Sequence, residues 1–142
     1  SMKELKWHEE GYTLAGIHSE EEKRLESLYK LNILDTAREE MFDKICKAAA
    51  QVFDVPLSFI TIVDRDRQWF KSTFGVDAEG TPRQDGFCAH CVSLDEDTMV
   101  VPNALDDPRF KTNPNVTSGL NIRFYAACPL RDPFNNLPMG TI

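Results

Sequence analysis

Residues 57–75 read LSFITIVDRDRQWFKSTFG, and this stretch decides the fold. The run from Leu57 to Val63 is rich in β-branched residues and apolar on both faces, which is typical of a strand covered on two sides. Charged residues at positions 64–67 form a turn, and residues 68–74 return as a second strand that ends at Gly75. The stretch therefore predicts a β-hairpin with a four-residue connection.

Two helices are predicted upstream of the hairpin. Ser19 and Glu22 form a capping box at the start of the first helix, and Thr36 and Glu39 repeat this pattern at the start of the second. The first helix carries the apolar residues Leu25, Leu28, Tyr29 and Leu31. The second carries an apolar stripe at helical spacing, which we expect to pack in the core. The stripe consists of Met41, Phe42, Ile45, Cys46, Ala49, Val52 and Phe53.

Shorter elements are predicted after the hairpin. A helix from about residue 87 to residue 94 has Asp85 as its expected cap. Asp107 and Pro108 indicate the start of another helix, because proline favours the first helical position. Short strands are expected around residues 98–101, 122–130 and 139–142. This order of elements indicates an α+β fold with a mainly antiparallel sheet.

The chain is expected to hold one domain, residues 19–142, behind an N-terminal arm, residues 1–18. The arm lacks clear periodicity, and we expect it to be loosely tethered and to pack through Trp7. Ser1 precedes a methionine, so we interpret it as the remnant of a cleaved tag. The chain stops in what reads as a strand. We therefore expect a domain that is incomplete at its C-terminus, with the last strand and helix truncated.

The charge balance argues against several classes of partner. The 142 residues carry a formal net charge of −7, whereas nucleic-acid-binding surfaces are basic, so we predict no nucleic-acid partner. No apolar run approaches the roughly 20 residues of a membrane helix. No signal peptide is evident either. We therefore expect no membrane insertion, a cytoplasmic location and reduced cysteines.

The sharpest local motif is the CxxC of Cys88 and Cys91, at the start of a predicted helix. A helix N-terminus lowers a thiol pKa, so a redox dithiol is one interpretation. A metal site is a second interpretation, although a single CxxC supplies too few ligands. In the third, which we favour, the two cysteines fill an apolar helix face. A thiol that contacts a ligand is a further alternative.

Polar residues near this motif are candidate ligand contacts. His90 projects about 200° around the helix from Cys88, so the two do not form a nucleophilic pair. His90 either lines a pocket or binds a nearby carbonyl. Strand alternation places Arg123 and Tyr125 on one face, where they would recognise an anionic ligand, unless the arginine pairs with a nearby aspartate. Phosphate-binding loops and hydrolase motifs are absent from the sequence, so we predict no catalytic residue, cofactor or metal site.

Many short motifs also occur in a particular order. They are Leu34-Asp35-Thr36, Met41-Phe42-Asp43, Val55-Pro56, Asp66-Arg67-Gln68-Trp69-Phe70-Lys71-Ser72, Thr81-Pro82-Arg83, Phe87-Cys88-Ala89-His90, Val100-Val101-Pro102-Asn103-Ala104, Asp107-Pro108-Arg109-Phe110, Asn113-Pro114 and Ile122-Arg123-Phe124-Tyr125-Ala126. In these motifs the chain resembles the GAF domains of bacterial signalling proteins over about residues 20–142. The resemblance implies a central antiparallel sheet with helices on both faces and an enclosed ligand pocket. It also implies a position N-terminal to an output module, such as a histidine kinase or a diguanylate cyclase, and dimerisation through flanking helices.

Carried over residue by residue, the resemblance places the pocket among Phe59, Thr61, Trp69, Phe87, Cys88, His90, Arg123 and Tyr125. The ligand itself is not specified, since the family's ligands range from cyclic nucleotides and tetrapyrroles to small metabolites. The function that we expect is a non-catalytic sensory domain of a signal-transduction protein, for example of a two-component system. One alternative is a ligandless dimerisation module whose aromatic side chains fill the pocket. A less favoured one is a thiol redox enzyme, because some GAF-fold proteins reduce free methionine sulfoxide.

Overall fold

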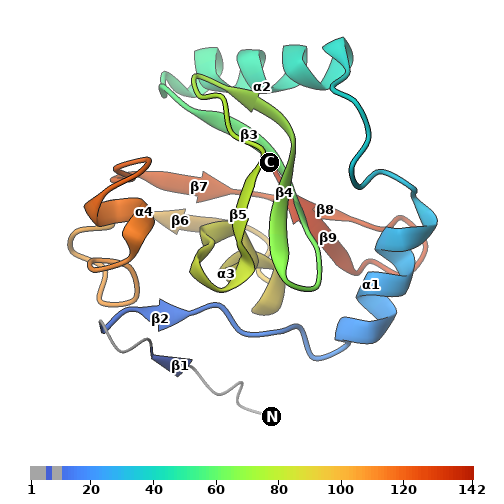
Figure 1. Ribbon diagram of the computed structural model, residues 1–142, viewed down its shortest axis with the longest axis horizontal. Helices are drawn as coiled ribbons and strands as arrows, with labels where there is room; N and C mark the ends of the chain where they lie inside the picture. The colour runs from blue at the N-terminus through green and yellow to red at the C-terminus, as the bar shows by residue number, and fades with distance from the viewer. Residues whose placement is uncertain (1–5, 8–10) are drawn as a thin grey trace.

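The computed structural model describes residues 6–7 and 11–142. Its centre is a five-stranded antiparallel sheet with the strand order β5-β4-β3-β9-β8 (Figure 1). These strands span Gly80–Pro82 (β5), Arg67–Phe74 (β4), Ser58–Val63 (β3), Pro138–Thr141 (β9) and Pro129–Arg131 (β8). Two small sheets pair β1 (Lys6–Trp7) with β2 (Thr13–Leu14), and β6 (Met99–Val101) with β7 (Tyr125–Ala127). The predicted α+β class is confirmed.

The hairpin predicted from residues 57–75 forms the middle of the large sheet. β3 and β4 pair antiparallel, and Val63 lies opposite Gln68 next to the turn. The register shifts by one residue after Ile60, which leaves Lys71 as the extra residue of a β-bulge. The bulge lies under the segment that joins the first two helices, and Lys71 binds that segment.

Helices cover both faces of this sheet, as predicted. α1 (Glu21–Lys30) and α2 (Glu40–Phe53) lie on one face, and Ile62 packs there against α1. α3 (Phe87–Ser93) lies on the other face, where Val63 packs against it. Successive residues of a strand point to opposite faces, so the β3 sequence itself separates the two layers of the core.

Neither predicted capping box forms. The residue before α1 is Glu20, and no side chain caps this helix. Glu22 instead pairs with Arg65 at the tip of the hairpin. α2 also lacks a side-chain cap, and Glu39 binds Lys71 on β4. The two carboxylates that the local pattern assigned to helix caps are therefore used in ion pairs with distant residues.

The apolar stripe of α2 is only partly covered. Cys46 and Ala50 are buried against the sheet. Met41, Ile45 and Val52 are 62%, 43% and 77% exposed. The prediction that the whole stripe packs in the core is therefore wrong for these three residues, because the sheet covers only one side of the apolar arc. It is also wrong for Phe53, the last residue of the helix, which is 73% exposed.

The region between the hairpin and β9 is less regular than predicted. α3 forms where expected, but no helix begins at Asp107 in this described part of the chain. The next helix is the short α4 (Pro114–Thr117), which Asn113 caps through its side chain. The strand predicted at 122–130 is divided into β7 and β8. None of the described helices is both long enough and apolar enough to cross a bilayer.

Two residues of the segment that precedes α1, Tyr12 and Thr13, are buried in the domain. Tyr12 is 2% exposed and donates its hydroxyl to Asp85, which therefore does not act as the predicted cap of α3. Asp85 ends the 3-10 helix η1 (Arg83–Asp85). Thr13 is fully buried. The expectation of a loosely tethered arm is thus wrong for these residues, whereas residues 1–5 and 8–10 and the Trp7 side chain lie outside the described part.

Candidate functional site

Polar side chains from different elements meet between α3 and the sheet. The Tyr125 hydroxyl donates a hydrogen bond to Sγ of Cys88 across 3.0 Å. The Cys88 thiol donates in turn to Oγ1 of Thr61, 3.4 Å away. Thr61 lies on β3, Cys88 on α3 and Tyr125 on β7, so the contact joins three elements of the fold. Apolar side chains surround it, including Val63 and Val92.

Aromatic rings fill the space beside this polar group. Phe87 and Phe110 stack with ring centroids 4.0 Å apart. Tyr125 packs against Phe87 at 5.0 Å, and His90 meets the Phe110 ring edge-on at 4.8 Å. Side chains of the chain itself therefore occupy the region in which the sequence placed a ligand pocket.

The structure brings together about half of the residues predicted to line the pocket. Cys88 contacts both Thr61 and Tyr125, and Tyr125 also packs against Phe87. Phe59 lies on the same strand as Thr61, and its ring packs on Phe70, 4.9 Å away.

Three other predicted residues lie elsewhere. Trp69 packs against α1 on the opposite face of the sheet. His90 is on the far side of α3, where it binds the main-chain oxygen of Thr13, one of the two roles predicted for it. Arg123 is exposed and donates to the main-chain oxygen of Val116. It precedes β7 rather than lying in a strand, so the expected arginine–tyrosine face does not form.

Burial shifts the pKa of two groups in this region, Tyr125 and Cys91. It raises the pKa of the Tyr125 hydroxyl well above the ordinary value, and the neighbouring Cys88 adds to the shift. Burial also raises the pKa of the Cys91 thiol to about 12. The lowered thiol pKa that a helix N-terminus would produce is therefore not found at Cys91.

The two cysteines of the CxxC face different surroundings. Cys88 points to the polar group, whereas Cys91 is fully buried in an apolar cluster that includes Met99 and Val101. All four cysteines are free thiols. In the described part of the chain, no group of three or more His, Cys, Asp or Glu side chains is arranged to hold a metal ion. The arrangement is that of packed side chains, and the Cys88 thiol contacts two hydroxyl groups, those of Thr61 and Tyr125.

Sequence reasoning missed Gln68, a buried residue of β4. Its Oε1 accepts the Ala89 backbone N–H across 2.7 Å, and its Nε2 donates to the Thr81 hydroxyl across 2.9 Å. A signal in the sequence was Gly86 before the predicted helix. It occupies the N-cap position of α3 and has no side chain, so the cap has to come from elsewhere in the chain.

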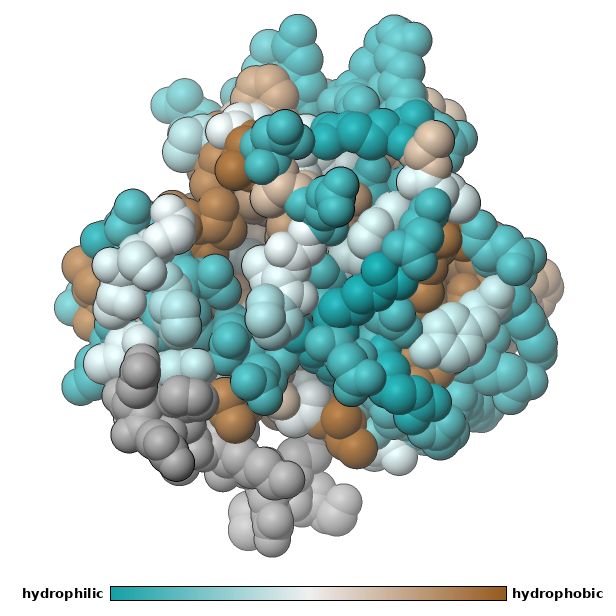
Figure 2. Space-filling model, viewed as in Figure 1, coloured by the Kyte–Doolittle hydropathy of each residue, from teal (hydrophilic) through white to brown (hydrophobic). Residues whose placement is uncertain are grey.

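A separate cavity of about 680 Å³ lies at the N-terminus of α1. It is lined by Ile17, His18, Ser19, Glu20, Glu21, Glu22, Lys23, Arg65, Asp66 and Arg83. Hydrophilic residues dominate the surface over the hairpin tip and α1 in Figure 2. Its charged side chains largely pair with one another, for example Arg83 with Glu21 and Arg65 with Glu22. This cavity is therefore not the predicted pocket, because it shares no residue with the predicted lining.

Comparison with known proteins gives one family. The GAF domain family model matches residues 37–142. A cyclic di-GMP phosphodiesterase of Pseudomonas aeruginosa is 40% identical over 111 residues, which are 78% of this chain and 19% of that protein. The chain thus spans less than a quarter of the length of this curated relative.

Two solved structures have a similar fold. A type II free methionine-R-sulfoxide reductase from Thermoplasma acidophilum gives a TM-score of 0.56 at 13% identity, covering 80% of this chain and 73% of that one. The GAF domain of an Acinetobacter phosphoenolpyruvate-protein phosphotransferase gives 0.54 at 15% identity, covering 84% and 73%. Such low identities show the fold alone. The family match, which covers most of the sequence, shows that this chain belongs to the GAF domain family.

Proposed function

We propose that this GAF domain is a non-catalytic sensory module of a signalling protein, and that it binds a small molecule beside Thr61, Cys88 and Tyr125. The observation that carries the proposal is the convergence of these three polar groups in an otherwise apolar region. Small-molecule sites combine apolar walls with a few convergent polar groups. The relation to a cyclic di-GMP phosphodiesterase supports a regulatory role beside a separate output domain.

The sulfur of Cys88 is a weak partner for the Tyr125 hydroxyl. A thiol accepts hydrogen bonds poorly, so a ligand that offers an oxygen or nitrogen acceptor would bind this hydroxyl more strongly. Such a ligand has to displace part of the aromatic cluster around Phe87. The binding-competent state is then a minor conformation of the free domain, which the ligand stabilises.

The surroundings favour a neutral ligand. The hydrogen bonds of the polar group come from a phenol, a thiol and a hydroxyl, none of them charged. Arg123, the cation expected at this site, is exposed and binds a carbonyl near α4. A charged ligand would therefore lose its hydration without gaining an ionic partner. We infer a small, neutral, planar molecule with one strong acceptor.

Two-dimensional NMR of the ¹⁵N-labelled domain with neutral heteroaromatic fragments, such as 2-pyridone, tests this proposal. We expect saturable shifts of the Cys88 and Tyr125 amides. Tyr125→Phe should weaken binding by about fivefold, the effect of one net hydrogen bond. Tyr29→Phe is the matched control, because Tyr29 binds Asp64 near the hairpin tip and lies outside the site. Shifts centred on the cavity at α1 would contradict the proposal.

The packed rings favour a second candidate, a ligandless regulatory or dimerisation module. Phe87 and Phe110 already stack at 4.0 Å, so the space has an occupant. In this case the fragments cause no saturable shift, and the domain forms a dimer in sedimentation experiments. The uncovered apolar residues of α2, such as Met41 and Val52, are the surface that we propose for self-association.

A thiol redox enzyme fits the geometry less well. A catalytic cysteine reacts as the thiolate, whereas burial keeps the Cys91 thiol neutral, and Cys88 is only 8% exposed. Reduction of free methionine sulfoxide by the domain, lost in Cys88→Ser, would establish this activity instead.

We propose that the domain works in the cytoplasm, beside an output module such as a histidine kinase, a diguanylate cyclase or a phosphodiesterase.

A further inference from the structure

The helix that carries Cys88 has no cap from its own segment. The N-cap residue of α3 is Gly86, which has no side chain, and the helix shows no local side-chain cap. The first N–H groups of a helix lack partners within the helix and are normally satisfied by the N-cap side chain. In this domain the third helical residue, Ala89, donates its N–H to Gln68 Oε1 at 2.7 Å. The cap is thus supplied from β4.

The Gln68 side chain is held in place at its other end. Its Nε2 donates to the Thr81 hydroxyl at 2.9 Å, and the residue is 4% exposed. The Gln68 backbone is paired on both sides, with Val63 of β3 and with Thr81 of β5. One side-chain amide on β4 therefore holds the N-terminus of α3 against the large sheet.

Gly86 is required by this arrangement for space, and not for its backbone conformation. Its φ of −84° and ψ of 134° are open to any residue. A Cβ added at Gly86 would fall onto the side-chain amide of Gln68. The Gln68 amide can therefore cap α3 only because residue 86 has no side chain.

We propose that Gln68 is the positioning residue of the candidate site. Its amide caps α3 and thereby fixes Cys88, the residue before Ala89, against Thr61 and Tyr125. Gly86 is the residue that makes room for this cap. The role at a ligand site rests on the proposed function, whereas the cap and its effect on Cys88 do not.

The reactivity of individual cysteines towards iodoacetamide, followed by peptide mass spectrometry, tests the cap without any ligand. Gln68→Met keeps the length of the side chain but removes the acceptor, whereas Gln68→Glu keeps an acceptor. We expect Gln68→Met to raise the alkylation rate of Cys88 by about fivefold, as loss of one helix cap would. Gln68→Glu should change the rate less than about twofold.

Cys46 is the internal control. It is fully buried in α2, on the other face of the sheet, so it reports opening of the whole domain. The proposal is overturned by any of three results. These are an unchanged Cys88 rate in Gln68→Met, an equal rise in Gln68→Met and Gln68→Glu, and an equal rise at Cys88 and Cys46.

A double-mutant cycle tests the contact between Gly86 and Gln68 separately. Gly86→Ala pushes the amide aside without removing it, so it should raise the Cys88 rate about as much as Gln68→Met does. In a Gln68→Ala background the space is empty, and the same Gly86→Ala change should have no further effect. Additive effects of the two substitutions would contradict the proposed contact. Failure of all fragments to bind would overturn the proposed function and leave these results unchanged.

Discussion

His90 donates a hydrogen bond from Nε2 to the main-chain oxygen of Thr13, 3.1 Å away. The imidazole is 1% exposed and meets the ring of Phe110 edge-on. His90 lies about 200° around α3 from Cys88, so the helix contacts the candidate site on one side and the segment before α1 on the other. One short helix, α3, thus contacts both the candidate site and the segment around Thr13.

This buried imidazole should make the stability of the domain depend on pH. Burial, with a smaller contribution from the nearby Arg109, lowers the pKa of His90 to about 4, although the hydrogen bond to Thr13 opposes this shift. An unfolded chain has a histidine pKa of about 6.5. Between these values the unfolded state binds a proton that the folded state does not, so stability should fall by about 3 kcal/mol as pH falls through this window. Urea unfolding at a series of pH values measures the loss.

His90→Gln is the control for this prediction. The glutamine amide can still donate to Thr13 but does not titrate, so this variant should keep its stability between about pH 6.5 and pH 4.5. Glu21 contributes in a different window. Its pKa is lowered to about 2 against the opposition of burial, by hydrogen bonds from Arg24 and Arg83, so its contribution is lost only as pH falls below about 4.5. Equal losses in the wild type and His90→Gln above that pH would contradict the assignment.

The sequence predicted the elements whose signals are local. The hairpin and α3 formed where their apolar patterns placed them. The two capping boxes failed because Glu22 and Glu39 bind Arg65 and Lys71, which lie far along the chain. A local pattern identifies a carboxylate that is able to cap a helix, but not a distant cation that competes for it.

The candidate site was predicted in part for similar reasons. Thr61, Cys88 and Tyr125 meet, but Trp69 lies on the other face of the sheet. This error was avoidable, because a four-residue connection already pairs Trp69 with Ile62, whose side chain points away from that of Thr61. The position of Arg123 could not be predicted from the sequence. It depends on a contact between separate loops, in which the Ala104 backbone N–H donates to the main-chain oxygen of Arg123.

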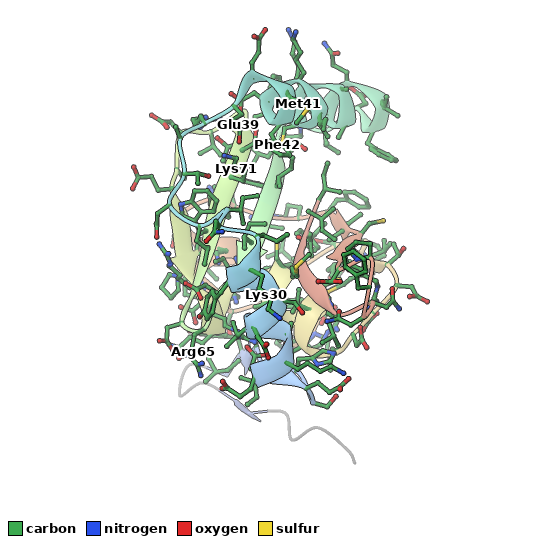
Figure 3. The ribbon with its side chains drawn as sticks, turned by 90° about the vertical axis from the view of Figure 1, so that its right-hand side faces the viewer. Lys30, Glu39, Met41, Phe42, Arg65 and Lys71 are labelled. Atoms are coloured by element: carbon green, nitrogen blue, oxygen red, sulfur yellow. The ribbon has the colours of Figure 1, made fainter. Side chains whose placement is uncertain are left out.

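Lys71 should be important for the segment between α1 and α2. Its Nζ donates to Thr36 Oγ1 at 2.8 Å and to the Ala37 oxygen at 2.6 Å, and it pairs with Glu39 at 2.7 Å (Figure 3). The Lys71 side chain is fully buried and lies over the ring of Phe42. Lys71→Met keeps the apolar stem but loses these bonds, so we expect about 2–3 kcal/mol less stability in urea unfolding. Hydrogen exchange of residues 33–39 should accelerate.

Glu39→Gln separates the ion pair from the other bonds of Lys71. The Glu39 side chain is 57% exposed, so solvent screens its charge, and we expect Glu39→Gln to lower stability by only about 1 kcal/mol. Thr36 and Ala37 still accept from the ammonium in this variant. A loss as large as that of Lys71→Met would show that the ion pair, and not the hydrogen bonds to the connecting segment, supplies the stability.

The four thiols should react in two classes. Cys128 is exposed, whereas Cys46, Cys88 and Cys91 are buried, and burial raises the pKa of Cys91 to about 12. At about pH 8 we therefore expect one thiol per folded chain to react rapidly with Ellman's reagent, and all four in denaturant. Rapid, paired loss of Cys88 and Cys91 on mild oxidation would instead support a redox dithiol.

The exposed half of the α2 stripe gives the last prediction. Met41, Ile45 and Val52 lie within roughly 40° of one another around the helix, and Ala50 lies more than roughly 100° further round. Periodicity detects this whole apolar arc but does not show how much of it the sheet covers. Val52→Asp should therefore change the unfolding free energy by less than about 0.5 kcal/mol, and Ala50→Asp should lower it by more than about 3 kcal/mol. Val52→Asp should also abolish any dimer seen by sedimentation, because a charge would enter the proposed interface. A large loss of stability in a monomeric Val52→Asp would show instead that this side chain is covered within one chain.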